Sequence, residues 1–351
     1  MLHTVVVKAL TLVDYNEFTY GDAPEPQPGE SDVLIEVKAC GICGSDVHGM
    51  DGSSGRRVPP IIMGHEAAGV IRETGAIAAE QGWKAGDRVT FDSTVYCGNC
   101  EACREGTINL CPDRRVLGVS CSDYRQHGAY ADLVMVPQHI CYPLPDELSF
   151  EHAAFAEPVS IALHAVSRVP TAKGKSAVVV GAGMIGILIV QALRLRGCDP
   201  VLAIDLDPRK LEKAKALGAA DGVLSTDADV LEKIRKVTGS DGADIAMEVV
   251  GISPTLQMAV NSVRKGGAVG LVGNLAAEAM LPLQTAVTRE LTLFGSCSCA
   301  GEYPEALRCI ADGSIQVEPL VSAVAPLAEG AEWFSRLQRG EEELLKVILR
   351  P

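Results

Sequence analysis

The pattern of hydrophobic and polar positions changes between Ala162 and Lys173. Long, turn-rich segments precede this stretch, whereas short apolar runs alternate with segments of helical spacing after it. Alternating strand and helix signals are typical of a parallel sheet wound with crossover helices. A chain of 351 residues is also long enough for about two domains. We therefore predict an α/β protein in which a turn-rich region precedes a doubly wound domain.

The predicted sheet begins with the run Ser176-Ala-Val-Val-Val-Gly181, which is apolar enough to be buried on both faces. Residues Met184 to Arg196 follow with helical spacing, and Pro200 to Asp205 has the pattern of a second strand. Further strand-like runs complete the sheet, at residues 242–249, 267–273 and 291–295.

A glycine motif, Gly181-Ala182-Gly183-Met184-Ile185-Gly186, joins the first strand to its helix. Such a match is weak alone, but between a strand and a helix it predicts a dinucleotide site. The glycines allow a tight turn against a pyrophosphate, which the helix N-terminus stabilises. Asp205 would accept hydrogen bonds from the ribose hydroxyls and repel a 2′-phosphate, which favours NAD over NADP. Arg209 is a further candidate cofactor residue, and with Lys210 it would accept a phosphate if Asp205 turned away.

Four cysteines stand close together before the predicted sheet, at Cys97, Cys100, Cys103 and Cys111. Thiolates at this spacing converge on one cation, and four of them form the closed tetrahedral shell of a structural Zn²⁺. No coordination position would remain open for a substrate. We predict a structural zinc loop at about residues 93–115.

A second metal site is predicted from Cys43 and His65. A catalytic zinc keeps three protein ligands and leaves one position open for water or substrate. The third ligand should be a carboxylate, and both Glu66 and Glu157 are candidates. Neighbouring residues on a strand point to opposite faces, which argues against Glu66 beside His65 unless the backbone turns there. Glu157 is expected to bind the metal or its water.

Proton transfer has its own candidates next to Cys43. Ser45 and His48 offer a hydroxyl and an imidazole at a spacing that suits a relay to solvent, with local turn bonding as the alternative. Asp46 is predicted to position other groups, His65 among them, rather than to react.

Charge and composition exclude some classes of protein. The formal net charge of −14 argues against a duplex nucleic-acid partner. No apolar run is long enough to predict a membrane span. Residues Met1 to Leu10 lack the pattern of a signal peptide, so a cytoplasmic location with reduced thiols is expected.

With these motifs together, the chain resembles the zinc-dependent medium-chain dehydrogenases over essentially its full length, and within them the sorbitol, or polyol, dehydrogenase branch. The stretch Glu157-Pro158-Val-Ser160-Ile-Ala-Leu-His164 is particularly similar to that branch. The resemblance implies a GroES-like catalytic domain (1–160), a Rossmann domain that binds NAD (161–296) and a C-terminal return to the first domain (297–351). It also implies a catalytic zinc held by Cys43, His65 and either Glu66 or Glu157.

The expected reaction interconverts a secondary alcohol of a polyol or sugar derivative with its ketone. Several polyol dehydrogenases carry an Arg-Tyr pair after the last sheet strand, where this chain has Ser296-Cys297-Ser298-Cys299, so the particular polyol stays open. Arg56 and Arg57 would suit a phosphorylated polyol, as in galactitol-1-phosphate dehydrogenases, although two solvated arginines are the simpler interpretation. A non-enzymatic dinucleotide-binding or redox-sensing protein is a distant alternative.

The resemblance further suggests a homodimer or homotetramer. The free edge of the last predicted strand, at 291–295, would pair across a two-fold axis.

Overall fold

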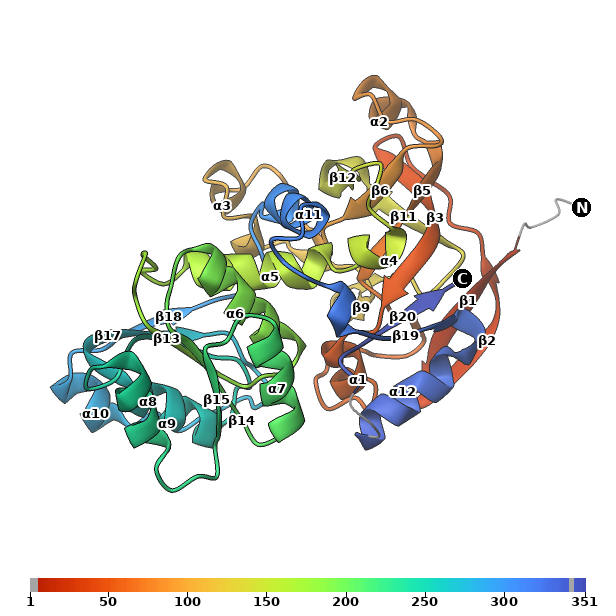
Figure 1. The fold of residues 1–351 in the computed structure, drawn as a ribbon. Helices are drawn as coiled ribbons and strands as arrows, with labels where there is room; N and C mark the ends of the chain where they lie inside the picture. Colours follow the sequence, from red (N-terminus) through yellow and green to blue (C-terminus); the bar gives the residue numbers. More distant parts are fainter. Residues whose placement is uncertain (1–5, 341–343) are drawn as a thin grey trace, which may run out of the picture. The chain divides into compact units, whose positions relative to one another are not determined.

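The computed structural model describes residues 6–340 and 344–351. The chain divides into two compact units (Figure 1). The first unit contains the chain up to Glu157 together with Tyr303–Asp312 and Val317–Pro351, and the second contains Pro158–Glu302 and Gly313–Gln316. The predicted domain limits at residues 160 and 296 stay predictions. Among the described residues, each helix is too short or too polar to cross a membrane.

The second unit is built on a sheet of six strands whose neighbours all run parallel. Its order is β15-β14-β13-β16-β17-β18, which is the 3-2-1-4-5-6 order of a doubly wound dinucleotide fold. The predicted α/β class is confirmed. The strands are β13 (Ala177–Val180), β14 (Val201–Asp205), β15 (Asp221–Leu224), β16 (Ala243–Glu248), β17 (Val263–Leu271) and β18 (Thr292–Gly295).

Helices cover this sheet in two groups (Figure 1). The helices α6 and α7 pack against each other and against β13 to β15, while α9 contacts both α8 and α10. Because helices lie on both faces, the four residues of β13 are almost completely buried, as their unbroken apolar pattern predicts. The helices are α5 (Ala156–Ser167), α6 (Met184–Leu195), α7 (Pro208–Ala216), α8 (Val230–Thr238), α9 (Ser253–Ser262) and α10 (Leu283–Thr288).

The first unit is β-rich and centres on a seven-stranded sheet of order β12-β6-β5-β3-β20-β19, with β11 also paired to β3. Smaller sheets pair β1 with β2 and β4, β7 with β8, and β9 with β10. The strands of the large sheet are β3 (Asp32–Gly41), β5 (Glu66–Thr74), β6 (Arg88–Phe91), β11 (Leu133–Pro137), β12 (Cys141–Pro143), β19 (Val321–Pro326) and β20 (Lys346–Arg350). The others are β1 (Val6–Asp14), β2 (Glu17–Pro24), β4 (Ile61–Ile62), β7 (Thr94–Val95), β8 (Arg115–Val116), β9 (Val119–Ser120) and β10 (Arg125–Gln126).

Helices of the first unit are short, apart from two near the C-terminus. They are α1 (Gly44–Gly49), α2 (Ala76–Glu80), α3 (Glu101–Arg104), α4 (Phe150–Ala153), α11 (Tyr303–Ala311) and α12 (Gly330–Arg339).

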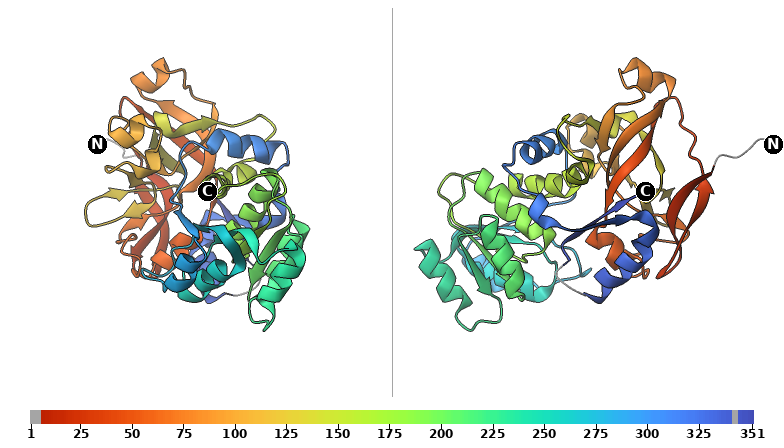
Figure 2. Two further views of the ribbon diagram at one scale, coloured as in Figure 1. Left: turned by 90° about the vertical axis from the view of Figure 1, so that its left-hand side faces the viewer. Right: turned by 45° about the vertical axis from the view of Figure 1, so that its right-hand side comes forward.

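Three strands distant in sequence meet where β3 ends. Figures 1 and 2 show the C-terminal strands in blue beside the orange strands of the N-terminal half. In the register of the sheet, Gly41 of β3 lies opposite Glu66 of β5 on one side and Ile348 of β20 on the other. This junction brings the start of β5, the start of β20 and the chain leaving β3 to one place.

Candidate metal and cofactor sites

Cys43 occupies the N-cap of α1, immediately after β3 ends. Its backbone is extended, with φ −86° and ψ 143°, and its sulfur accepts hydrogen bonds from the backbone N–H of Ser45 at 3.4 Å and from Ser45 Oγ at 3.2 Å. Donors aimed at a sulfur favour the thiolate. The cap therefore holds Cys43 Sγ in a position that suits a metal ligand.

His65 and Glu66 follow a turn that only glycine accommodates. Gly64 has φ +95°, and a Cβ there would lie 2.8 Å from the Tyr130 ring and 2.9 Å from Cys40 Sγ. The ligand atoms of Cys43, His65 and Glu66 all lie within 4.8 Å of one another. The sequence left open whether the backbone turns here. It does turn, because β5 begins only at Glu66 and His65 still belongs to the turn, so strand alternation does not separate the two side chains.

A lysine from the other end of the chain pairs with Glu66. Lys346 Nζ donates to Glu66 Oε2 and, at 3.0 Å, to the carbonyl oxygen of Ile42, and both charged side chains are buried. Burial alone would lower the pKa of Lys346, but Glu66 and Cys43 hold it above its ordinary value. One oxygen of Glu66 is thus committed to Lys346, which leaves the other for a cation.

Asp46 lies beside His65. Its Oδ2 is 3.5 Å from His65 Nδ1, a buried ring nitrogen with no hydrogen bond of normal length among the described residues. Burial would raise the pKa of Asp46, but His65 and the guanidinium of Arg57 hold it below its usual value. The predicted positioning role of Asp46 stays a prediction, and the geometry suits it.

Arg57 differs from its predicted role. Its side chain is only 5% exposed, and its Nε and Nη2 donate to Asp46 Oδ1 at 2.9 and 2.7 Å. A guanidinium already committed to a buried carboxylate has no free edge for a substrate phosphate or carboxylate. The simpler interpretation of a solvated Arg57 is therefore wrong, and the geometry does not favour Arg57 as a substrate-phosphate ligand, whereas the neighbouring Arg56 is exposed.

Glu157, the other candidate carboxylate, lies in the first turn of α5. It is outside the group formed by Cys43, His65 and Glu66 but lies close enough to feel their charges. Burial and the nearby Glu66 and Cys43 raise the pKa of Glu157 to about 8, although His65 opposes the shift. Glu157 therefore faces the same site without belonging to its closest set of donors.

This collection of donors fits a divalent cation. Burial, followed by the charge of Glu66, raises the pKa of Cys43 to about 12. The acidic groups of Cys43, Glu66 and Glu157 lie near one another, and the one lysine, Lys346, is paired with Glu66. The three groups therefore cannot all ionise unless a cation binds between them. Sulfur, imidazole and carboxylate donors are the set that a catalytic Zn²⁺ takes, with a fourth position left open.

Ser45 and His48 are both exposed on α1, three positions apart and hence on one helix face. The hydroxyl of Ser45 is within hydrogen-bonding distance of Cys43 Sγ, and the carbonyl oxygen of His48 accepts from Ser53 Oγ at 3.0 Å. This placement is compatible with the predicted relay, which stays a prediction.

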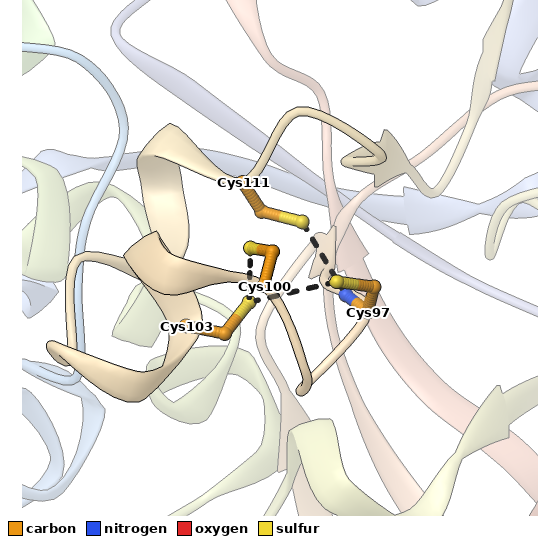
Figure 3. Close-up of side chains that lie close together, drawn as sticks. All are labelled: Cys97, Cys100, Cys103 and Cys111. Atoms are coloured by element: carbon orange, nitrogen blue, oxygen red, sulfur yellow. Dashed lines mark hydrogen bonds between the residues drawn. The ribbon is translucent and has the colours of Figure 1, made fainter.

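The four cysteines predicted to hold a structural zinc converge in one loop (Figure 3). Cys97 follows β7, Cys100 caps α3, Cys103 lies in that helix, and Cys111 follows a short 3₁₀ helix at Ile108–Leu110. Sγ of Cys103 is 3.4 Å from that of Cys100 and 4.0 Å from that of Cys97. A tetrahedral ZnS₄ centre requires about 3.8 Å between sulfurs, given Zn–S bonds of about 2.3 Å.

The charge states of these thiols also suit a cation. Backbone N–H groups of Asn99 and Cys100 lower the pKa of Cys97 to about 7, whereas burial and a hydrogen bond with Cys100 raise that of Cys103 to about 12. Thiols packed this closely share protons unless a metal compensates their negative charge. The loop therefore has both the spacing and the electrostatics of a structural zinc site.

The glycine motif forms the predicted turn between β13 and α6. Gly181 has φ +103°, Gly183 is the N-cap of α6, and Met184 and Ile185 open the helix. A Cβ on Gly186 would lie 1.8 Å from the carbonyl oxygen of Gly181, whereas one on Gly183 would meet no atom within 4 Å. Gly186 thus allows the helix to pack on the turn, and Gly183 leaves open space that a pyrophosphate would fill.

Asp205 ends β14 beside this turn. Its Oδ2 accepts from the backbone N–H of Ala182 at 2.7 Å and its Oδ1 from that of Asp207 at 3.0 Å. A carboxylate has about four lone pairs, so acceptor capacity remains for ribose hydroxyls. Arg209 directs Nε and Nη2 to Asp207 at 3.0 and 2.7 Å, so its charge is already balanced by a carboxylate.

Comparison with known proteins agrees with this geometry. Residues 29–146 match the family model of the alcohol dehydrogenase GroES-like domain, and residues 185–312 match that of the zinc-binding dehydrogenases. The chain is 35% identical to sorbitol dehydrogenase of Bacillus subtilis, covering 100% of this chain and 99% of that one. The chain belongs to the zinc-binding dehydrogenase family. The predicted resemblance to the zinc-dependent medium-chain dehydrogenases is confirmed.

Two further relatives extend the comparison for this dehydrogenase. It is 34% identical to L-idonate 5-dehydrogenase of Vitis vinifera, with 85% of this chain and 81% of that one covered. A zinc-binding dehydrogenase of Sinorhizobium meliloti, solved with NADP bound, superposes with a TM-score of 0.90 at 29% identity and covers 99% of this chain and 100% of that one. Because the family consists of enzymes, the prediction of a dehydrogenase is confirmed and the non-enzymatic alternative loses its support.

Sequence reasoning did not find two residues of the metal site. Lys346 comes from the C-terminal strand, and no local pattern connects it with Glu66. Tyr130, whose hydroxyl lies 3.0 Å from both Asp46 Oδ2 and the Gly41 carbonyl oxygen, lies in a segment without a motif. The pairing of β20 with β3 brings Lys346 to the site, whereas backbone hydrogen bonds with Leu10 and Met63 hold Tyr130 there.

Proposed function

We propose that this dehydrogenase interconverts a secondary alcohol of a polyol or sugar derivative and the corresponding ketone, with zinc and NAD as cofactors. The observation that carries the proposal is the close group of Cys43, His65 and Glu66, a donor set that leaves a coordination position open. Sorbitol and L-idonate dehydrogenases among its relatives support a polyol or sugar-derived substrate.

We propose Cys43, His65 and Glu66 as the catalytic ligands, with Glu157 placed to hold water or a substrate hydroxyl beside them. When bound, zinc would supply Lewis acidity, which lowers the pKa of a coordinated hydroxyl. Asp46 orients the His65 ring, and Lys346 holds Glu66. Ser45 and His48 are placed to carry the hydroxyl proton toward solvent, and bound NAD would supply the acceptor for the hydride of the carbinol carbon.

The remaining metal and cofactor residues divide between the two units. Cys97, Cys100, Cys103 and Cys111 hold a structural zinc in the first unit, which we propose as the catalytic domain. The second unit binds the dinucleotide through Gly181, Gly183, Met184, Ile185 and Gly186. The tight turn at Gly181 supports the dinucleotide assignment, and the distances between the sulfurs support the zinc assignment.

We propose NAD rather than NADP as the preferred cofactor, although a solved relative carries NADP. The support comes from this chain's own charges. Asp205 presents a carboxylate next to the glycine turn, which would repel a 2′-phosphate, and Arg209 is bound to Asp207. Arg209 is then a residue near the adenosine ribose rather than a phosphate ligand.

We also propose a homodimer or homotetramer in the cytoplasm. The strand β18 has a free edge in the six-stranded sheet, and Leu283 and Val287 of the adjacent α10 are 64% and 65% exposed. The twelve cysteines are free of disulfides, as expected for a reducing compartment.

The experiment that tests the proposed function is NAD reduction, followed at 340 nm, across free polyols, phosphorylated polyols and simple secondary alcohols. Each reaction is run with and without a zinc chelator, and Cys43→Ser serves as the site control. We expect turnover of a free polyol that both the chelator and Cys43→Ser abolish, while NADH binding to Cys43→Ser is unchanged. Chelator-resistant turnover, or full activity of Cys43→Ser, would refute the zinc mechanism.

A further inference from the structure

Arg57 is the most deeply buried arginine of the site and makes polar contacts in several directions. Its Nε and Nη2 donate to Asp46 Oδ1, its Nη2 also donates to Ser45 Oγ at 3.4 Å, and its Nη1 donates to the carbonyl oxygen of Arg56 at 2.9 Å. None of these acceptors is a metal donor. The two side-chain acceptors, Asp46 and Ser45, however, each lie next to a proposed metal ligand.

The two acceptors lead to different metal ligands. Asp46 Oδ2 lies 3.5 Å from Nδ1 of His65, and Ser45 Oγ donates to the sulfur of Cys43 at 3.2 Å. We propose that Arg57 is a positioning residue that sets the geometry of two ligands at once, His65 through Asp46 and Cys43 through Ser45. This inference rests on the proposed catalytic metal site.

The shape of the guanidinium explains why an arginine serves here. Its planar guanidinium donates from Nε and Nη2 to one carboxylate oxygen and still reaches two further acceptors, Ser45 Oγ and the Arg56 carbonyl oxygen, in directions fixed by the conjugated plane. A lysine ammonium at this position would carry the same charge on one nitrogen. It would neutralise Asp46 without spanning the distance to Ser45.

Arg57 is itself held in place by backbone pairing. The N–H of Ser120 donates to the carbonyl oxygen of Arg56, and the N–H of Val58 donates to that of Ser120, both at 3.2 Å. These bonds fasten the segment around Arg57 to the hairpin of β9 and β10. The side chain therefore projects from an anchored strand segment, which is what a positioning residue requires.

On the far side, the Tyr130 hydroxyl completes the surroundings of Asp46 at 3.0 Å from Oδ2. Asp46 thus has Arg57 on one oxygen and Tyr130 with His65 on the other. Fixing both oxygens leaves the carboxylate one orientation toward the imidazole. Loss of the Arg57 fork would free the Oδ1 side and let the carboxylate rotate.

The test compares Arg57→Lys and Arg57→Met with the wild-type holoenzyme. The catalytic metal is defined as the ion that Cys43→Ser removes. Its release rate to a chromogenic chelator is measured, and its ligand geometry is read from the absorption bands of the cobalt-substituted protein after subtraction of the Cys43→Ser spectrum. Outer contacts of this kind affect metal affinity by about 10–100-fold, so we expect release to accelerate by that factor in Arg57→Met.

Arg57→Lys keeps the charge and the fold, so it separates positioning from stability. We expect it to retain Asp46 pairing yet to release the catalytic metal several-fold faster, with shifted cobalt bands. Arg125→Met is the matched control, because Arg125 fastens the same segment through Pro59 O and Ser120 Oγ at 3.3 Å without contacting Asp46 or Ser45. Its release rate and cobalt bands should equal those of the wild type.

The inference is overturned if Arg57→Lys, folded by thermal melting, matches the wild type in both release rate and cobalt bands. It is also overturned if Arg125→Met reproduces the Arg57→Met effect, since loop anchoring would then explain everything. Failure of the proposed function has another signature. The wild type itself would hold one zinc per chain, and Cys43→Ser would remove none.

Discussion

At the scale of single residues, we expect the carboxylates Glu66 and Glu157 to have different roles at the proposed metal site. Glu66 is paired with the buried Lys346 and lies within the donor group, whereas Glu157 lies beside that group. We expect Glu66→Gln to lose the catalytic zinc and to leave Lys346 buried without a carboxylate, at a cost of about 3–5 kcal/mol in unfolding free energy. Glu157→Gln should keep its zinc and lose turnover.

Zinc content by mass spectrometry and denaturant unfolding check this division. Glu151→Gln is a control, because Glu151 pairs with Arg350 nearer the surface, where such pairs contribute at most about 1 kcal/mol. Zinc loss in Glu157→Gln but not in Glu66→Gln would reverse the two roles.

Cofactor choice depends on two neighbouring aspartates. Asp205→Ala removes the carboxylate beside the glycine turn, so we expect the NAD preference, as a ratio of kcat/KM values, to fall by about 10–100-fold, which corresponds to one lost hydrogen bond to a charged group. Asp207→Ala instead removes the carboxylate that pairs with the Arg209 guanidinium and should improve kcat/KM with NADP. An NAD/NADP ratio unchanged by Asp205→Ala would refute the ribose contact.

At the scale of elements, the turn between β13 and α6 contains one glycine that packing requires, Gly186, and one whose open side suits ligand binding, Gly183. A methyl group on Gly186 would collide with the Gly181 carbonyl oxygen, whereas one on Gly183 would enter open space. Gly186→Ala should therefore lower both the Tm and NADH affinity. Gly183→Ala should keep the wild-type Tm and weaken NADH binding at least about tenfold, if the pyrophosphate fills that space. Wild-type NADH affinity in Gly183→Ala would refute this placement.

The cysteine loop is an element whose stability we expect to depend on a bound metal. Loss of one sulfur breaks the closed shell, and structural zinc contributes its binding free energy to folding. Cys100→Ser should release one zinc per chain and lower the Tm, while Cys297→Ser, a change at an exposed thiol, should do neither. A Cys100→Ser protein with full zinc content would contradict the structural site.

At the scale of the whole molecule, the proposed oligomer gives a prediction of its own. We expect sedimentation to show a dimer or tetramer, because exposed Leu283 and Val287 flank the free edge strand β18. Replacing both with Glu should shift the protein toward monomers, whereas Val324→Glu, at an exposed position in the first unit, should not. A wild-type monomer at micromolar concentration would refute the proposal.

Prediction from the sequence worked best where the signal was local. The apolar run at 176–181 and the spacing of Cys97, Cys100 and Cys103 predict a strand and a sulfur cluster that the structure contains. The short strand β15 was missed, since Asp221 and Gly222 give it no apolar alternation. The strand β17 begins at Val263 rather than at Gly267, because pairing with β16 extends across the polar residues that precede the apolar run.

The sequence by itself determined the family, the parallel sheet, the glycine turn and the cysteine loop, because each depends on residues a few positions apart. Only the tertiary structure decided that Arg57 binds Asp46, that Lys346 meets Glu66, and that His65 and Glu66 share one site. Lys346 and Glu66 come from strands far apart in the sequence, Arg57 and Asp46 from a loop and a helix, and His65 from a turn whose direction strand alternation does not predict. A buried charge pairs with the group that the fold places beside it, and this partner cannot be predicted from the spacing of residues along the chain.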